Sequence, residues 1–244
     1  MMKINEKKGK NMKIIAGNWK MNGTADALRE MQAALANIST ENRVILCVPF
    51  VFLGAASGPA AIGAQDVSAH DHGAFTGEVS ASMLAATGVK YAIVGHSERR
   101  MYHHETNEIV RQKAEMALSH GITPIICVGE TMDEKNAGKT MEIIESGVRE
   151  SVPGDGDDVI VAYEPRWAIG AGITPTDDEI AAAHTLIAET LEKMGRGGTP
   201  ILYGASVKGD NAAKLMSIPH VDGVLVGGAS LKPDDFIPII MATK

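Results

Sequence analysis

The sequence Tyr163-Glu164-Pro165-Arg166-Trp167-Ala168-Ile169-Gly170-Ala171-Gly172 stands directly after an apolar run at residues 159–162. A short run without alternating polar positions is typical of a strand that is buried on both faces, as in a parallel sheet. In an α/β barrel, the residues that carry the chemistry follow the strands at their carboxyl ends. This stretch therefore predicts a buried parallel strand with a functional loop after it.

Short apolar runs of the same kind recur along the whole chain. Segments with turn residues or helical spacing separate them, so that strand and helix alternate about eight times. The predicted strands are residues 13–16, 44–48, 60–63, 91–94, 122–128, 159–162, 200–203 and 223–226.

Two of the segments between the strands carry specific helix signals. Thr176 and Glu179 match a capping box, in which a hydroxyl and a carboxylate satisfy backbone N–H groups at the start of a helix. A second helix is expected from about Thr106 to a stop at His120-Gly121. The apolar residues that share one face are Ile180, Ala183, Ile187 and Leu191 in the first helix and Val110, Ala114, Ala117 and Leu118 in the second.

This alternation predicts one α/β domain, a single closed (β/α)8 barrel over residues 12–244. No break in composition and no linker rich in proline, glycine and serine divides the chain. A doubly wound open sheet is the alternative, because it also buries parallel strands under helices. Residues 1–11 are polar and lysine-rich, and we expect them to be a disordered leader or a tag-like extension.

Composition limits the possible classes of function. The chain has 45% hydrophobic and 22% charged residues, which is typical of a globular protein, and a net charge of -7, which disfavours nucleic acid and anionic membranes as partners. Its longest uncharged apolar stretch, residues 44–56, is interrupted by Pro49 and Gly54 and is too short to span a membrane. Cys47 and Cys127 lie in apolar runs, which predicts a reducing compartment and no disulfide.

Three side chains at predicted strand ends point to proton transfer. Glu164 is the candidate base, because partial desolvation at the end of an apolar strand makes a carboxylate a better proton acceptor. His96 could donate a hydrogen bond to a carbonyl oxygen, and Lys20 could stabilise negative charge. Taken singly, Glu164 could be an ion-pair partner, His96 a structural residue and Lys20 a solvated charge. Their occurrence at three strand ends favours a common site.

Glycine-rich turns after the last two strands point to a phosphate group. Tyr203-Gly204-Ala205-Ser206 follows the seventh strand, and Val226-Gly227-Gly228 follows the eighth. Glycine lets backbone N–H groups approach an anion, above all where a helix begins. One such turn is usually plain turn chemistry, but a pair at this position is typical of phosphate sites in barrels. We therefore expect Ser206, Gly227 and Gly228 to bind phosphate.

Several of these segments, in this order, resemble the triosephosphate isomerase family, and the resemblance extends from Met12 to the end of the chain. That family has a TIM barrel fold and interconverts dihydroxyacetone phosphate and glyceraldehyde 3-phosphate. The segments that carry the resemblance are Asn18-Trp19-Lys20, Gly73-Ala74-Phe75-Thr76-Gly77-Glu78, His96-Ser97-Glu98-Arg99, Tyr163-Glu164-Pro165 and Val226-Gly227-Gly228.

The resemblance implies a role for each residue at the strand ends. In the assignment that is well known for that family, Glu164 moves a proton between two substrate carbons, and neutral His96 polarises the carbonyl group. Lys20 would stabilise enediolate and phosphate charge, and Asn18 would donate to a substrate oxygen. Glu98 would orient Lys20, although a structural ion pair explains it equally well.

The resemblance also implies a mobile lid at residues 167–176. The backbone N–H of Gly170 would reach the phosphate when this lid closes and excludes water. Ser206, Gly227 and Gly228 match the other phosphate contacts of the family.

By the same resemblance, the protein would be a cytoplasmic homodimer that acts in glycolysis and gluconeogenesis without a cofactor or a metal. The loop at residues 73–78 would insert into the partner subunit, where Thr76 would contact the active site. Phe75 at its tip supports such a contact, because an exposed aromatic side chain leaves apolar area for a partner to cover.

The chain departs from the family pattern at three places. Arg166 replaces the usual apolar residue of the first lid hinge, and Ile173-Thr174-Pro175 differs from the common second hinge. Ala205 replaces a glycine whose peptide reorients when ligand binds, and a non-glycine residue at positive φ would be strained there. The helix near residues 51–57 is also expected to be short.

Three other functions compete with this interpretation. His70-Asp71-His72 is a His-x-His pair that could indicate a metal hydrolase. Another phosphosugar isomerase or lyase could use the same phosphate turns, but it would not need Lys20, His96 and Glu164 together. A non-catalytic barrel that binds a metabolite would not need to keep Glu164.

Overall fold

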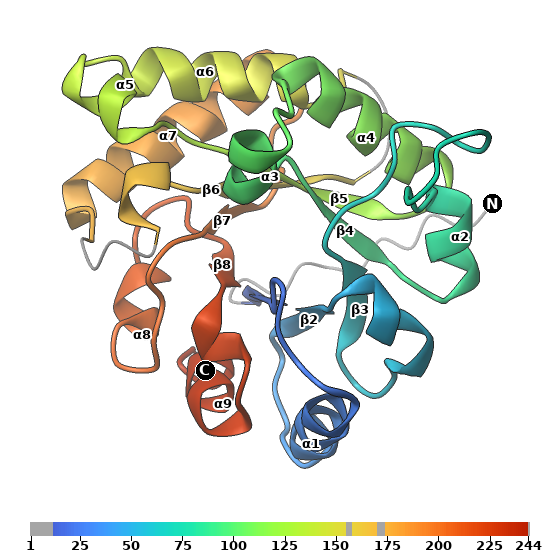
Figure 1. The fold of residues 1–244 in the computed structure, drawn as a ribbon. Coiled ribbons are helices and arrows are strands. Elements are labelled where there is room, and N and C mark those ends of the chain that lie inside the picture. Colours follow the sequence, from blue (N-terminus) through green and yellow to red (C-terminus); the bar gives the residue numbers. More distant parts are fainter. Residues whose placement is uncertain (1–11, 155–157, 170–173, 244) are drawn as a thin grey trace.

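The computed structural model describes residues 12–154, 158–169 and 174–243. Within these residues, eight parallel strands pair in sequence order and close into a barrel through the pairing of β1 with β8. Figure 1 shows the helices around this barrel, with the first helix, α1, beside the last, α9. The predicted single (β/α)8 barrel is confirmed, and the doubly wound open sheet is wrong.

Each strand begins and ends within about two residues of the predicted run, because the apolar runs are the segments that the barrel buries on both faces. The strands are β1 Ile14–Asn18, β2 Arg43–Cys47, β3 Ala61–Ala64, β4 Tyr91–Val94, β5 Thr123–Val128, β6 Ile160–Tyr163, β7 Ile201–Tyr203 and β8 Gly223–Val226.

The helices vary widely in length around the barrel. The connection between β2 and β3 contains only a 3-10 helix, which agrees with the short helix expected near residues 51–57. The helical elements are α1 Ala25–Ala36, η1 Phe50–Ala55, α2 Ala81–Ala86, α3 Ser97–Tyr102, α4 Asn107–Ser119, α5 Met132–Asn136, α6 Thr140–Ser151, η2 Arg166–Ala168, α7 Asp177–Lys193, α8 Ala212–Leu215, η3 Gly228–Ser230 and α9 Pro233–Ile240.

Both helices with specific sequence signals form where the signals place them. Thr176 caps α7, and both hydrogen bonds of the capping box with Glu179 are present. Thr106 caps α4 by accepting from the backbone N–H of Ile109. Gly121 then adopts φ 69°, a left-handed conformation that glycine adopts without strain, just after α4 ends.

The core has two parts, one inside the barrel and one between the strands and the helices. Alternate residues of each strand face the two parts, so both faces of the sheet are apolar. Cys47 and Cys127 belong to the inner part, and both are free thiols. Burial raises the pKa of Cys47 to about 12, which keeps it a neutral thiol. In the described part of the chain, no helix is long and apolar enough to cross a membrane.

Glycine allows the barrel to close at the junction of its first and last strands. Gly223 of β8 pairs with Ile14 of β1. A Cβ atom at position 223 would lie 2.0 Å from the carbonyl oxygen of Ile14, which is far inside van der Waals contact. Any larger residue must therefore push β1 and β8 apart.

We expect Gly223→Ala to lower the free energy of unfolding by at least about 3 kcal/mol, because the added methyl group meets backbone and not a flexible side chain. Urea unfolding would measure the loss. Gly54→Ala is the matched control, since a Cβ atom there meets nothing within 4 Å, and its effect should stay within about 0.5 kcal/mol. Equal stabilities of the two variants would contradict this account of barrel closure.

Candidate active site

The barrel brings the predicted proton-transfer residues to one end. Asn18 is the last residue of β1, His96 follows β4 by two residues, and Glu164 directly follows β6. Since all the strands are parallel, their carboxyl ends open at the same mouth. All three side chains are buried there.

One backbone hydrogen bond and one close contact with His96 hold the Glu164 carboxylate. Its Oε2 accepts from the backbone N–H of Ser97 at 2.9 Å, and its Oε1 lies 3.1 Å from Nε2 of His96. Ser97 is the first residue of α3, so a backbone donor at a helix start faces the carboxylate. Glu164 is only 3% exposed, and these donors replace the water that burial removes.

The surroundings of His96 determine which ring nitrogen carries the proton. Its Nδ1 accepts from the backbone N–H of Glu98 at 3.2 Å, so Nδ1 carries no proton. The proton of the neutral ring is therefore on Nε2, the nitrogen that lies 3.1 Å from Oε1 of Glu164.

Lys20 reaches across the mouth from β1. Its backbone adopts φ 52°, and its N–H donates to Oδ1 of Asn18 at 3.0 Å. Its ammonium group forms an ion pair with Glu98 at 2.8 Å. A Cβ atom on Gly227 would lie 3.5 Å from Cε of Lys20, so the turn after β8 borders the same side chain. Lys20 thus connects the ends of β1, β4 and β8.

The expected phosphate residues lie at the ends of the last two strands. Gly227 precedes η3, which begins at Gly228, so this turn does open a short helix. Ser206 lies well before α8, and its carbonyl oxygen accepts from Nδ2 of Asn211, so no helix begins at Ser206. Gly170 falls outside the described residues.

Ala205 is not strained in this structure. The non-glycine residues with positive φ in the described part are Lys20, His104 and His220. The strain expected at Ala205 is therefore absent here, and only the ligand-bound conformation could contain it.

The structure does not bring Thr76 to the other site residues. Thr76 is exposed in the loop between β3 and α2, which extends from the barrel in Figure 1. Gly73 and Gly77 both have positive φ, and the backbone N–H of Phe75 donates to the Gly73 carbonyl. The Phe75 ring stacks on His70 with a centroid distance of 3.8 Å. The loop is thus held by contacts within itself, and the Thr76 side chain is exposed to solvent.

A buried carboxylate that we did not predict holds Trp167, the first residue of the expected lid. Glu130 is 1% exposed, and its Oε1 accepts from Nε1 of Trp167 at 2.8 Å and from the Tyr163 hydroxyl at 3.3 Å. Burial raises the pKa of Glu130. Lys135 lies 3.5 Å above the Trp167 ring and pairs with Glu179 of α7 at 2.6 Å. The rule that functional residues follow strands could have found Glu130, since it comes just after β5.

A buried histidine supports the strands beneath the mouth. His184 of α7 contacts the rings of Tyr163 and Tyr203, which end β6 and β7. Its Nδ1 donates to the carbonyl oxygen of His220 at 2.9 Å. Burial lowers the pKa of His184 to about 4, so the ring is neutral at pH 7.

The His-x-His pair does not form a metal site in this structure. His70 stacks on Phe75, while Asp71 lies 3.2 Å from His72 and 3.3 Å from His120. Across the described ranges, no group of three or more His, Cys, Asp or Glu side chains could hold a metal ion. Nothing here favours the metal hydrolase.

Comparisons with known proteins give one consistent family. The sequence model of the family described as triosephosphate isomerase matches residues 13–243. A triosephosphate isomerase from Albidiferax ferrireducens is 46% identical over 93% of this chain and 97% of its own. One from Halorhodospira halophila is 45% identical over 94% of this chain and 97% of its own. A crystal structure of triosephosphate isomerase from Bartonella henselae matches with a TM-score of 0.84 and 36% identity, over 94% of this chain and 98% of its own.

Neutral His184 makes the stability of the protein depend on pH. An unfolded histidine binds a proton near pH 6.5, whereas the folded one resists it down to about pH 4, so acid favours the unfolded state in this interval. We expect His184 to account for a loss of about 3 kcal/mol in the free energy of unfolding between these pH values. His184→Gln should lack this part of the pH dependence. Identical slopes of stability against pH in both proteins would contradict the assignment.

Proposed function

The chain belongs to the triosephosphate isomerase family, and on this premise we propose how its residues interconvert dihydroxyacetone phosphate and glyceraldehyde 3-phosphate. The observation that carries the proposal is the buried contact of the Glu164 carboxylate with Nε2 of His96 at the mouth of the barrel. A base and a proton donor side by side match an isomerisation that moves one proton between carbons and another between oxygens.

Glu164 is the base of this reaction. It removes a proton from the hydroxyl-bearing carbon next to the substrate carbonyl group; the C–H electrons form a C=C bond, and the electron pair of the C=O bond moves to the carbonyl oxygen. That oxygen takes the proton on Nε2 of His96, and the hydroxyl group on the first carbon gives its own proton back to Nε2. Return of the first proton to the former carbonyl carbon then yields the isomer. In the present structure, the backbone N–H of Ser97 and Nε2 of His96 occupy the carboxylate, so substrate must take their place before proton transfer begins.

His96 donates from Nε2 to the oxygen that becomes negative. The bond of its Nδ1 with the Glu98 N–H sets this tautomer before substrate arrives. The substrate oxygen then replaces the Glu164 carboxylate as the acceptor of the Nε2 proton. A preorganised donor of this kind contributes about 10²–10³-fold in rate.

Lys20 and Asn18 stabilise the enediolate and the phosphate group. Lys20 supplies the positive charge, and its position between Glu98 and Gly227 supports contact with both groups. Ser206, Gly227 and Gly228 bind the phosphate through backbone N–H groups, and Gly170 adds one when the lid closes.

Exposed apolar side chains support a homodimer. Met21, Phe50, Phe75 and Met101 follow the carboxyl ends of β1, β2, β3 and β4, which are neighbours in the barrel. A second copy of this side of the barrel would cover them, and it would bring Thr76 of one subunit to the active site of the other.

The remaining features fit a cytoplasmic enzyme. Both cysteines are free thiols, and the net charge of -7 disfavours nucleic acid and anionic membranes. The proposed chemistry uses protein side chains and backbone donors alone, without a cofactor or a metal. Residues 12–244 form the catalytic domain in this proposal; the leader at residues 1–11 falls outside the described residues and stays a prediction.

We expect Glu164→Gln to reduce turnover of glyceraldehyde 3-phosphate by at least about a thousandfold, because the amide keeps the shape but cannot accept the proton. A coupled assay on purified protein measures the rate. Addition of EDTA is the control for metal dependence and should leave the wild-type rate unchanged. A loss below about tenfold in the variant, or a rate that requires metal, would refute the proposed mechanism.

We expect Phe75→Glu combined with Thr76→Lys to produce monomers whose turnover collapses, although both proton-transfer groups remain. Sedimentation gives the mass and the coupled assay gives the rate. Met141→Glu is the matched control, since Met141 is an exposed apolar residue of α6, away from the loops after β1–β4. A monomer with wild-type turnover would show that catalysis does not need the partner.

A further inference from the structure

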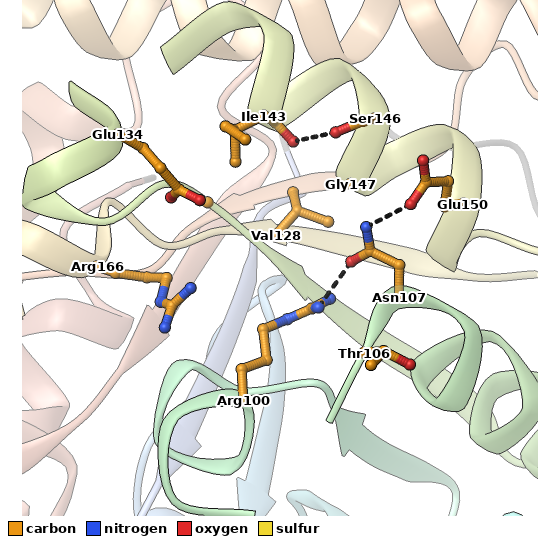
Figure 2. A pocket seen from close by; sticks show the side chains of 11 residues that line it. Arg100, Thr106, Asn107, Val128, Glu134, Ile143, Ser146, Gly147, Glu150 and Arg166 are labelled. Atoms are coloured by element: carbon orange, nitrogen blue, oxygen red, sulfur yellow. Dashed lines mark hydrogen bonds between the residues drawn. The ribbon is translucent and has the colours of Figure 1, made fainter. Parts of the chain in front are cut away.

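A polar pocket lies beside the lid hinge and apart from the proton-transfer residues. Figure 2 shows it beside Val128, the last residue of β5, with Ile143 and Gly147 of α6 and Arg166 of η2 around it. Its volume is about 360 Å³, enough for a small molecule. Among the described residues, its lining includes Arg100 and Arg166 but not Asn18, Lys20, His96 or Glu164.

Contacts within the protein already occupy most of the Arg100 guanidinium. Its Nε donates to the Gly95 carbonyl at 2.8 Å, and one terminal nitrogen donates to the Cys127 carbonyl at 3.0 Å. The other donates to Oδ1 of Asn107 at 2.7 Å, and Asn107 in turn donates to Glu150 at 2.8 Å. Arg100 is therefore held in place where it lines the pocket.

Arg166 lines the same pocket, and its guanidinium has no partner among the described residues. Its Nε is buried and has no hydrogen bond there. Figure 2 likewise shows no bond to Arg166, whereas Arg100 is bonded to Asn107. Because buried polar groups in proteins are normally hydrogen-bonded, the buried Nε atom lacks an acceptor among the described residues. Burial lowers the pKa of Arg100, and the nearby charge of Arg166 lowers it further.

The proposed isomerase mechanism does not explain Arg166. Its position in the family pattern is an apolar hinge residue, so proton transfer and phosphate binding do not require a guanidinium there. An arginine at this place adds donors to the pocket, and the described active-site contacts do not include its side chain.

We propose that this pocket binds a small monocarboxylate, with Arg166 as its main ligand. The planar guanidinium can donate two parallel hydrogen bonds to one carboxylate. The Thr106 hydroxyl, which accepts from Ile109 N–H, keeps its own proton to donate. A bound carboxylate supplies the acceptor that Arg166 lacks.

The charges of the pocket favour a monoanion over a phosphate dianion. Glu134 and Glu150 line the pocket together with the two arginines, so its formal charge is balanced. A dianion would face both carboxylates at close range, whereas a single negative charge can sit on the Arg166 side.

The ligand would also act on the lid. Arg166 begins η2, and the next residue is Trp167, which Glu130 holds through Nε1. A carboxylate on Arg166 would tie η2 to the pocket wall, and the Trp167 fluorescence should therefore change on binding.

The test is a titration of wild-type protein with sodium acetate at constant ionic strength, followed by NMR of ¹³C-labelled acetate and by Trp167 fluorescence. Arg166→Leu should weaken binding at least tenfold, and Arg166→Lys should weaken it less, because a lysine keeps the charge but not the planar fork. Lys20→Met, which alters the active site, should bind acetate as the wild type does. Thermal unfolding checks that each variant is folded.

Three results would overturn the proposal. The first is the absence of Arg166-dependent binding up to 100 mM acetate, on the order of a hundred times a millimolar dissociation constant. The second is a loss of binding in Lys20→Met equal to that in Arg166→Leu, which would place the anion in the active site. The third is equal or tighter Arg166-dependent binding of inorganic phosphate.

Discussion

Closure of the barrel between β1 and β8 is the constraint on which the rest of the structure depends. Gly223 lets the two strands approach, because its missing side chain leaves room for the Ile14 carbonyl oxygen. Once the ring is closed, all eight carboxyl ends open on one side. Residues that are far apart in the sequence, such as Lys20 and Glu164, then share one mouth without any direct sequence signal that joins them.

Burial determines how Glu164 and His96 interact at the mouth of the barrel. Glu164 and His96 are almost fully enclosed, and each satisfies the other while the first backbone N–H groups of α3 satisfy the remaining atoms. Removal of water strengthens these contacts. In the proposed mechanism, the same arrangement that makes burial tolerable prepares a base and a proton donor for substrate.

Helices outside the barrel hold Trp167, where the expected lid begins. Glu179 caps α7 with one carboxylate oxygen and pairs with Lys135 through the other. Lys135 in turn covers Trp167, and Glu130 holds the same ring from within. The position of Trp167 therefore depends on α5, α7 and the end of β5 together. Arg166 adds a charged group beside them.

The sequence by itself determined the strands, the two capped helices and the candidates Glu164, His96 and Lys20, because apolar runs, capping boxes and strand ends are local patterns. Only the tertiary structure decided which side chains meet. Three arrangements each join residues of different elements: the ion pair of Lys20 with Glu98, the hydrogen bond of Trp167 to Glu130, and the pocket that Arg166 and Arg100 line together. Their distances depend on how the barrel closes and how the helices pack against it, and no local pattern encodes these distances.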